Sequence, residues 1–101
     1  MKMINEVIII GTYKSEDGFI QLNGKKYLHI TVEVEKAFIN NDGIYEKDLI
    51  DCLLWKGEAD RLLALLQDCH WLSLKGRLEK HNDQMYVMAE KIKYLDSMIH
   101  N

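Results

Sequence analysis

The stretch from Asp48 to Lys80 constrains the fold more than any other part of the chain, because its hydrophobic period changes twice. Its first eight residues, Asp48 to Trp55, are rich in Leu, Ile, Cys and Trp and contain no turn residue. Such a segment is typical of a mostly buried strand. Lys56 and Gly57 follow it, so we expect the strand to end at Trp55.

A short helix and a second strand come next. In Glu58 to Gln67 the leucines at positions 62, 63, 65 and 66 fall on one side of a helical projection, and the charged residues fall on the other. Trp71 to Lys80 returns to a period of two, with apolar positions from Leu72 to Leu78 on one face and polar positions on the other. The sequence predicts a helix of about three turns between two strands, with the Trp71 ring packed at the helix end.

The N-terminal part predicts a strand and a hairpin. Asn5 to Thr12 is rich in β-branched residues, and its continuous apolar run indicates burial on both faces. Lys14 to Gly18 is polar and contains a glycine, so we expect a turn there. Phe19 to Leu22 then ends at Asn23 and Gly24, which form the strongest short hairpin signal.

The remaining strands also follow from alternation and turn residues. Tyr27 to Glu35 alternates, with Leu28 and the apolar positions that follow it facing inward and the polar positions facing solvent. A turn cluster, Asn40 to Gly43, predicts a hairpin with the next strand. His81 to Asp83 predicts a tight turn into a last strand, Gln84 to Leu95. The chain therefore predicts five strands with one helix between the third and the fourth.

Composition sets limits on location and on charge. The 101 residues are expected to form one domain, 1–101, with a net charge of -3 and a pI near 5.8, so that any binding of a polyanion must be local. The longest apolar run, Val7 to Ile10, is far shorter than the roughly 20 residues of a membrane span. No signal-peptide cleavage pattern follows it, and we expect a cytoplasmic protein. Cys52 and Cys69 do not form a secreted disulfide framework, and both are expected to be reduced.

Four stretches in order resemble the bacterial single-stranded DNA-binding proteins. The central pattern I-D-C-L-L-W-K, the helix rich in Ala and Leu, and L-S-L-K-G-R-L-E are similar to the core of that family. Met3 to Gly11 resembles its first strand, Ile30 to Phe38 its second, and Tyr86 to Leu95 its last. The resemblance covers nearly the whole chain and implies an all-β fold, a five-stranded OB-fold barrel with one short helix between the third and fourth strands.

The resemblance also implies a function and an assembly. Such proteins bind single-stranded DNA without sequence preference, in replication, recombination, repair or DNA uptake. Their first strands pair across a two-fold axis and the dimers form tetramers, so we expect an oligomer interface at Val7, Ile8, Ile9 and Ile10. Alternatively, this run only fills the barrel. The family usually continues into a disordered segment with an acidic tip that recruits partner proteins, and because the sequence ends at Asn101 we expect no such recruitment.

Exposed aromatic rings are the expected stacking sites, because each stacked base contributes about 1 to 3 kcal/mol. In the alignment with the family, Phe38 and Trp55 fall at two stacking positions, near the ends of the second and third strands. Trp55 could instead be a core or helix-capping residue, and Phe38 could pin the hairpin. Tyr86 could add stacking, although a tyrosine in a strand more often packs. Leu49 stands where the family often carries Trp or Phe, and the turn at 81–83 is short, so we expect a shallower groove and weaker binding or a shorter footprint.

Basic residues near this face are the expected phosphate contacts. The candidates are Lys36, Lys56, Lys75, Arg77 and Lys80. Lys75 and Arg77 are two residues apart and share one face of the predicted fourth strand, which would present adjacent cations to a nucleic-acid backbone. The alternative is that any one of these charges only keeps a solvated face soluble, so that the cluster carries the argument.

No metal, cofactor or catalytic site is expected. Cys52, Cys69, His29 and His70 lack the C-x-x-C or H-x-x-x-H spacing of zinc ligands. The chain contains no G-x-S-x-G, phosphate-binding loop or H-E-x-x-H motif. We therefore expect a binding protein and not an enzyme.

Two other functions remain open. The acidic charge and the missing tail favour a dimeric primosomal or phage-type OB protein that binds single strands weakly within a protein assembly. The leucine at position 49 would also allow an OB-fold interaction module without any nucleic-acid role. A titration with polythymidine separates the first two functions from the third, and the oligomer mass separates the first from the second.

Overall fold

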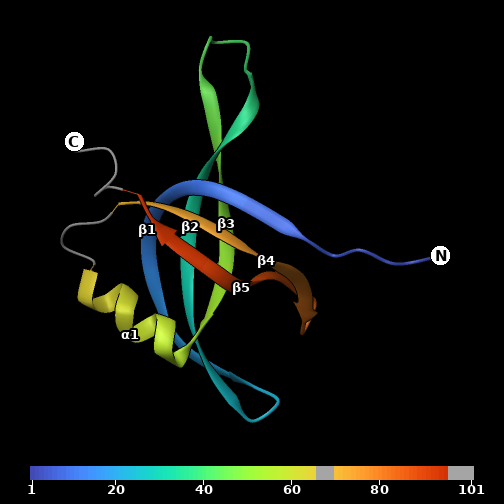
Figure 1. Ribbon diagram of the computed structural model, residues 1–101. Helices are drawn as coiled ribbons and strands as arrows, with labels where there is room; N and C mark the ends of the chain where they lie inside the picture. The colour runs from blue at the N-terminus through green and yellow to red at the C-terminus, as the bar shows by residue number, and fades with distance from the viewer. Residues whose placement is uncertain (66–69, 96–101) are drawn as a thin grey trace.

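The computed structural model describes residues 1–65 and 70–95. Its elements follow the chain in the order β1 (Val7–Leu22), β2 (Lys25–Ile39), β3 (Tyr45–Trp55), α1 (Lys56–Leu65), β4 (Trp71–His81) and β5 (Gln84–Tyr94). The strands close into a barrel in the order β1-β2-β3-β5-β4, in which β3 and β5 are parallel and the other pairs antiparallel (Figure 1). This arrangement confirms the predicted OB-fold barrel.

Alternating side chains build the core of the barrel. Leu28, Ile30 and Val32 of β2 are fully buried, as the predicted period of two requires. They pack with core residues from β3, α1, β4 and β5, among them Leu62 of the helix and Leu74 of β4. The inward face of each strand therefore matches the hydrophobic alternation of the sequence.

The expectation of a turn at residues 14–18 is wrong, because this segment lies within β1. β1 is a long bent strand that pairs with β4 from Val7 to Thr12 and with β2 from Thr12 to Leu22. Two irregularities in its register with β2, between Tyr13 and Ser15 and between Glu16 and Phe19, allow the bend. One strand therefore joins both of its neighbours and closes the barrel.

The other predicted turns are confirmed. Asn23 and Gly24 have positive φ angles of 51° and 79°, and Asn82 and Asp83 have angles of 51° and 65°. Two such residues in succession are typical of the tight turns that match strand twist. At the hairpin between β2 and β3 the Asn40 side chain accepts hydrogen bonds from the backbone nitrogens of Asp42 and Ile44, at 2.9 and 3.0 Å.

The central unit differs in detail from its prediction. β3 begins at Tyr45, its first half is exposed, and the fully buried part is only Cys52 to Leu54. The helix begins directly at Lys56, and its predicted last residues lie outside the described part of the chain. Leu63, expected on the apolar side, is 36% exposed.

Glu58 and Trp71 also differ from their expectations. Glu58 falls on the charged side of the predicted helix, but it is buried, and its carboxylate accepts a hydrogen bond of 3.1 Å from the Tyr94 hydroxyl. Trp71 is 44% exposed, and the helix end against which it was expected to pack lies outside the described residues. No helix in the described part of the chain is long and apolar enough to cross a membrane.

Candidate nucleic-acid interface

The outward side chains of β2, β3, β5 and β4 form one continuous face. Strand register places His29 beside Leu53, Leu53 beside Met88, and Met88 beside Arg77. Leu53 and Met88 are buried, although the residues on either side of Leu53 point into the core. The face therefore has an apolar floor with polar residues at its margins.

A hollow of about 230 Å³ lies over this floor, between the tips of the β1–β2 and β4–β5 hairpins. Its lining combines apolar, aromatic and charged side chains from both hairpins: Leu22, Asn23, Lys25, Tyr27, Arg77, Glu79, His81 and Met88. We call this hollow and the row from His29 to Arg77 the inter-hairpin face.

The predicted aromatic residues are not gathered in one place. Trp55 is 39% exposed at the end of β3 and lies opposite Tyr27, which lines the hollow. Tyr86 is half-buried, with its ring edge-on to His29 at 5.5 Å between centroids, and His81 lies near its other side at 6.2 Å. The structure thus brings Trp55 and Tyr86 to the inter-hairpin face and adds Tyr27, which the sequence analysis missed.

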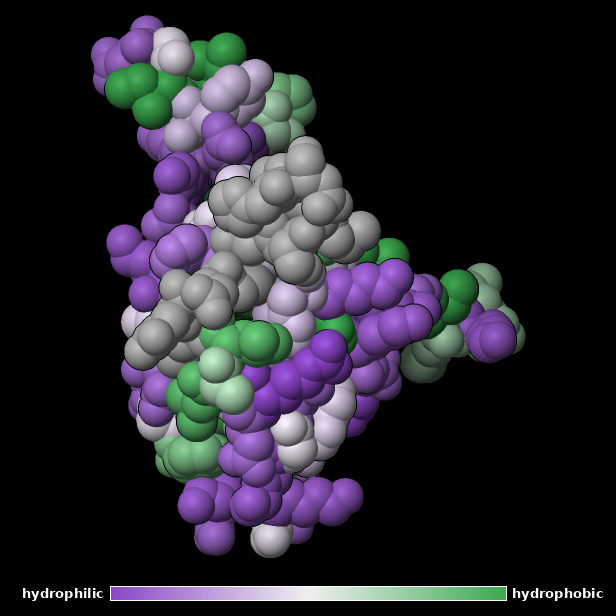
Figure 2. Space-filling view, turned by 60° about the vertical axis from the view of Figure 1, so that its left-hand side comes forward, coloured by the Kyte–Doolittle hydropathy of each residue, from purple (hydrophilic) through white to green (hydrophobic). Residues whose placement is uncertain are grey.

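Phe38 lies elsewhere, near the end of β2. β2 and β3 extend past the barrel as a two-stranded arm, on the side away from α1 (Figure 1). Phe38 is 83% exposed on this arm, and Ile39 and Ile44 beside the turn are exposed as well. Figure 2 shows hydrophobic side chains at the end of the arm. A nucleic-acid strand could reach Phe38 only if it left the barrel surface and ran along the arm.

Most of the predicted basic residues are already neutralised by carboxylates. Their ion pairs are Lys36 with Asp48 (2.9 Å), Lys56 with Asp60 (3.5 Å), Lys75 with Glu6 (3.1 Å), and Arg77 with Glu79 (2.6 Å) and Glu90 (3.0 Å). Within residues 1–65 and 70–95, only Lys80 of the five candidates has no such pair. The sequence identified cations, but their pairing depends on strand register.

These ion pairs change proton affinities on the inter-hairpin face. The hydrogen bond and the charge of Glu79, together with those of Glu90, raise the pKa of Arg77 above its usual value. Burial raises the pKa of Glu79, but hydrogen bonds from His81 and Arg77 and their positive charges outweigh burial, and the net pKa is lowered. Glu79 is therefore ionised at neutral pH and holds Arg77 in place.

A histidine between two aspartates marks the margin of the same face. His29 Nε2 lies 2.8 Å from Asp51 Oδ1 and 3.8 Å from Asp17 Oδ2, and these groups could together hold a metal ion. The Thr31 hydroxyl donates to Asp17 at 2.6 Å and the Gln84 amide donates to Asp51 at 3.1 Å. Because hydrogen bonds already satisfy these carboxylates, the cluster has a complete structural role as it stands.

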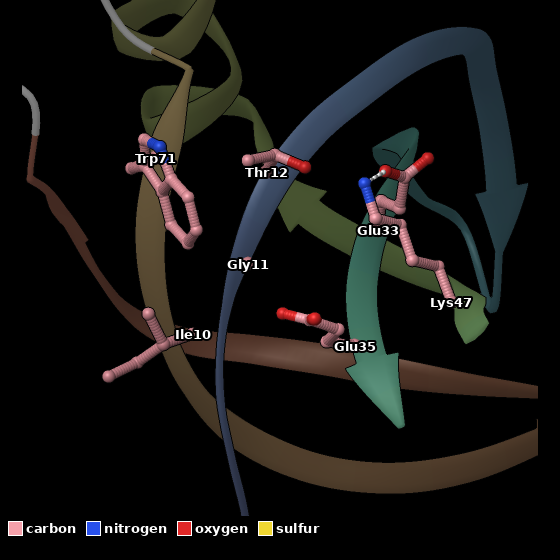
Figure 3. Close-up of a pocket in the computed structure, with 7 residues that line it drawn as sticks. All are labelled: Ile10, Gly11, Thr12, Glu33, Glu35, Lys47 and Trp71. Atoms are coloured by element: carbon pink, nitrogen blue, oxygen red, sulfur yellow. Dashed lines mark ion pairs between the residues drawn. The ribbon is translucent and has the colours of Figure 1, made fainter. Parts of the chain in front are cut away.

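A second hollow, of about 240 Å³, opens beside Gly11 where β1 changes partner (Figure 3). Glu35 and Glu33 line it from β2, and Trp71 and Ile10 from the other side. Lys47 pairs with Glu33 at 3.0 Å, the dashed contact in Figure 3. With two carboxylates and one lysine, this hollow has the wrong charge for a phosphate.

A third hollow, of about 200 Å³, lies on the outer surface of β4 and β5. Three lysines surround it, Lys75, Lys91 and Lys93, with Ile8 and Ser73 completing the lining. We call the three lysines the lysine patch. Lys91 and Lys93 were not among the predicted contacts, although their alternation about the buried Ile92 was visible in the sequence.

The predicted interface residues divide into two pairs. Val7 and Ile9 pack against the barrel core, whereas Ile8 and Ile10 are 66% and 57% exposed. Burial on both faces of this run is therefore not seen within the single chain. From Val7 to Gly11, β1 pairs with β4 only, so its other edge carries no strand among the described residues.

Cys52 is chemically silent in this fold. Its side chain is fully buried, and burial together with the charge of Asp51 raises the pKa of its thiol to about 12. It is a free thiol, as expected, while Cys69 lies outside the described residues. A thiol protonated at neutral pH has little nucleophilic or metal-binding character.

Similar proteins were found by sequence and by structure, although the chain matches no protein-family model. It is 30% identical over 104 residues to a single-stranded DNA-binding protein of Bacillus cereus, covering 93% of this chain and 61% of that protein. Single-stranded DNA-binding protein B of Bacillus subtilis is 25% identical, with 93% and 92% covered. The chain thus spans about 60% of the first of these relatives, and both names describe DNA binding and no catalysis.

Solved structures agree in fold. A small single-stranded DNA-binding protein from Mycoplasma pneumoniae superposes with a TM-score of 0.69 at 16% identity, covering 90% of this chain and 93% of that one. A small single-stranded DNA-binding protein from Streptomyces coelicolor gives 0.66 at 12% identity, with 92% and 95% covered. The resemblance seen in the sequence is therefore confirmed: over most of its length the chain is similar to bacterial single-stranded DNA-binding proteins.

Proposed function

We propose that the chain binds single-stranded DNA without sequence preference, with the inter-hairpin face as its principal binding surface. The observation that carries this proposal is the pair of Trp55 and Tyr27, which lie opposite one another and are both accessible, beside an apolar floor. Every base has a flat apolar surface that stacks on such rings, so binding of this kind tolerates all sequences. The relatives' names support the same ligand.

The test is the fluorescence of Trp55 during titration with polythymidine. A base that covers the ring alters its emission, and Trp55→Ala should lose about 1 to 3 kcal/mol of binding free energy. Trp71→Phe is the matched control, because Trp71 is also partly exposed but lines the hollow beside Gly11. If Trp55→Ala folds and binds as tightly as the parent, the ligand does not occupy this face.

The assembly proposal concerns the free edge of β1. An open edge bearing Ile8 and Ile10 is an aggregation hazard unless another strand covers it. We propose that a second copy pairs there across a two-fold axis, with tetramer formation behind the dimer. In this arrangement Ile8 and Ile10 contribute side chains, while Val7 and Ile9 contribute mainly their backbone.

A weaker binding role within a protein assembly is the second candidate. It is favoured by the pairing of four of the five predicted cations with carboxylates, which leaves few of the expected phosphate contacts free. The dimeric N-terminal domain of PriB from Thermoanaerobacter tencongensis has a similar fold, with a TM-score of 0.54, 19% identity and 89% and 94% of the two chains covered. Sedimentation distinguishes a stable dimer from the tetramer of the first proposal.

The host process, whether replication, recombination, repair or DNA uptake, is proposed at the level of the family only, as is the cytoplasmic location.

A further inference from the structure

The lysine patch is an energetically unfavourable arrangement that the fold does not require. Strand register places Lys75 directly opposite Lys91, and Ser73 directly opposite Lys93. Like charges that face each other across two antiparallel strands destabilise the sheet. All three lysines are exposed, so their stems contribute little burial in return. A local conflict of this kind is expected where a surface serves a ligand.

The surrounding charges make the patch more distinctive. The chain has 16 acidic and 13 basic residues, yet the two lysines on β5 have no ion pair within the described part of the chain. Lys75 alone has a partner, Glu6, at 3.1 Å. The patch is therefore a local excess of positive charge on an acidic protein.

An acidic residue lies at an irregularity in β4–β5 pairing beside the patch, but it pairs with an arginine outside the patch. The register shifts between Lys75 and Gly76, so that Lys75 pairs with Lys91 while Gly76 pairs with Ala89. The extra residue is Glu90, and its carboxylate turns to Arg77 at 3.0 Å. In a regular strand Glu90 would point to the face opposite Lys91, whereas at the bulge both are exposed and Arg77, not a lysine of the patch, pairs with the Glu90 carboxylate.

We propose that the lysine patch is a second phosphate-binding surface, which holds the backbone of the same nucleic-acid strand after it leaves the inter-hairpin face. The occupant follows from charge and spacing. Lys91 and Lys93 are two residues apart on one strand, about 6.7 Å, so they can meet successive phosphates of an extended chain. Ile8 and Ser73 complete the lining of the hollow, and no aromatic ring is among its described lining residues, so the patch binds phosphates and reads no bases.

The inference deepens the proposed function and rests on it, because it extends the path of the same ligand. If a second copy pairs with the free edge of β1, Ile8 lies between the two-fold axis and Lys75. The patches of the two copies would then share one sheet face and form a longer positive surface.

The experiment measures the affinity of the full chain for a polythymidine strand as a function of salt. Each phosphate neutralised on a single strand contributes about -0.7 to the slope of log affinity against log salt. Lys91→Ala with Lys93→Ala should therefore flatten the slope by about 1.4. If the affinities converge near 1 M salt, this corresponds to about a 25-fold weaker affinity at 0.1 M. Base preference and the quenching of Trp55 at saturation should not change.

Two further variants act as controls. Lys91→Arg with Lys93→Arg keeps both charges and should bind like the parent. Lys14→Ala with Lys47→Ala removes the same net charge from lysines that pair with Glu33, away from the patch, and should leave the slope nearly unchanged. An equal loss in this control would show an effect of net charge alone and would overturn the inference.

The outcomes separate the inference from the function on which it rests. A parent that does not bind polythymidine at low salt overturns both. A parent that binds, with an unaltered slope in Lys91→Ala with Lys93→Ala, overturns only the lysine patch. Competition by polyglutamate that equals competition by polythymidine, and that is lost in the same variant, would assign the patch to an acidic protein instead of a nucleic acid.

Discussion

The inter-hairpin face and the lysine patch carry similar charged residues but differ in what those residues contact. On the inter-hairpin face Arg77 is held between Glu79 and Glu90, at 2.6 and 3.0 Å. On the lysine patch Lys91 lies opposite Lys75 and Lys93 lies opposite Ser73, with Glu6 as the only carboxylate partner among the described residues. The number of cations on a surface therefore does not locate a phosphate site. A phosphate site is indicated by the number of cations that have no carboxylate partner.

The difference also separates two kinds of recognition. The inter-hairpin face offers Trp55, Tyr27 and Tyr86, and carboxylates hold its arginine, which suits bases. The lysine patch offers charge and no aromatic ring among its described lining residues, which suits phosphates. A strand that crosses both would present bases to one surface and backbone to the other.

The largest expected effect comes from the residue that joins the two surfaces. Gly76 lies on β4 between Lys75 and Arg77, and a Cβ added there would collide with the backbone carbonyl of Met88. Because backbone cannot move aside as a side chain can, Gly76→Ala should cost about 3 kcal/mol or more of unfolding free energy and impair both surfaces. Gly57→Ala, whose Cβ would meet only Trp55 at 3.6 Å, should change stability by less than about 1 kcal/mol in chemical denaturation. Equal stability of the two variants would contradict the close approach of β4 and β5.

The next effect tests whether the lysine patches of two copies adjoin. Ile10→Asp places a charge at an exposed position of the free β1 edge that does not line the lysine patch, so the barrel should fold while the assembly dissociates. Sedimentation should show a smaller species, with a salt slope per chain that stays close to that of the parent. Leu49→Asp, at a site of similar exposure on β3, should leave the mass unchanged. A parent that is already monomeric at micromolar concentration would sink the proposed assembly.

Much of the fold follows from the sequence because its signals are local. The alternation around Leu28 predicts β2, and the Asn23-Gly24 pair predicts the first hairpin turn, since each depends only on neighbouring residues. The expectation at residues 14–18 failed because polar residues and a glycine resemble a turn. There, pairing with β2 and two register irregularities override the local preference.

The candidate site was less predictable because charge pairing depends on register. Arg77 is separated from Glu90 by 13 positions, and they meet only because β4 and β5 pair with a shift beside Gly76. The same shift places Lys91 opposite Lys75. Alternation alone shows that Lys91 is exposed, but it does not show what faces it. Sequence therefore found the residues of both surfaces more readily than their partners.

A moderate effect is expected from releasing the paired arginine. Glu79→Gln with Glu90→Gln removes both carboxylates that hold Arg77, which would then be available to a phosphate. One added contact should steepen the salt slope by about 0.7 and tighten polythymidine binding by about five-fold at 0.1 M salt. Glu16→Gln with Asp42→Asn makes the same change in net charge at two exposed positions outside both surfaces. If this control tightens binding equally, the pairing of Arg77 does not limit the inter-hairpin face.

The smallest expected effect is a pH dependence of the unfolding free energy, to which the inter-hairpin face should contribute and the lysine patch should not. The pKa of Glu79 is lowered in the folded chain, so its ion pairs stabilise the fold above the unfolded value near 4.5, and this contribution is lost as pH falls through the lowered pKa. Glu79 is partly exposed, so the loss should stay below about 1 kcal/mol. Chemical denaturation at pH 6 and at pH 3.5 should show a smaller difference for Glu79→Gln than for the parent. In contrast, Lys91→Ala with Lys93→Ala should keep the parent's full dependence, because lysines do not titrate in this range. If Glu79→Gln retains the parent's dependence, the pairing of Arg77 with Glu79 adds nothing to stability and the contrast between the two surfaces rests on binding alone.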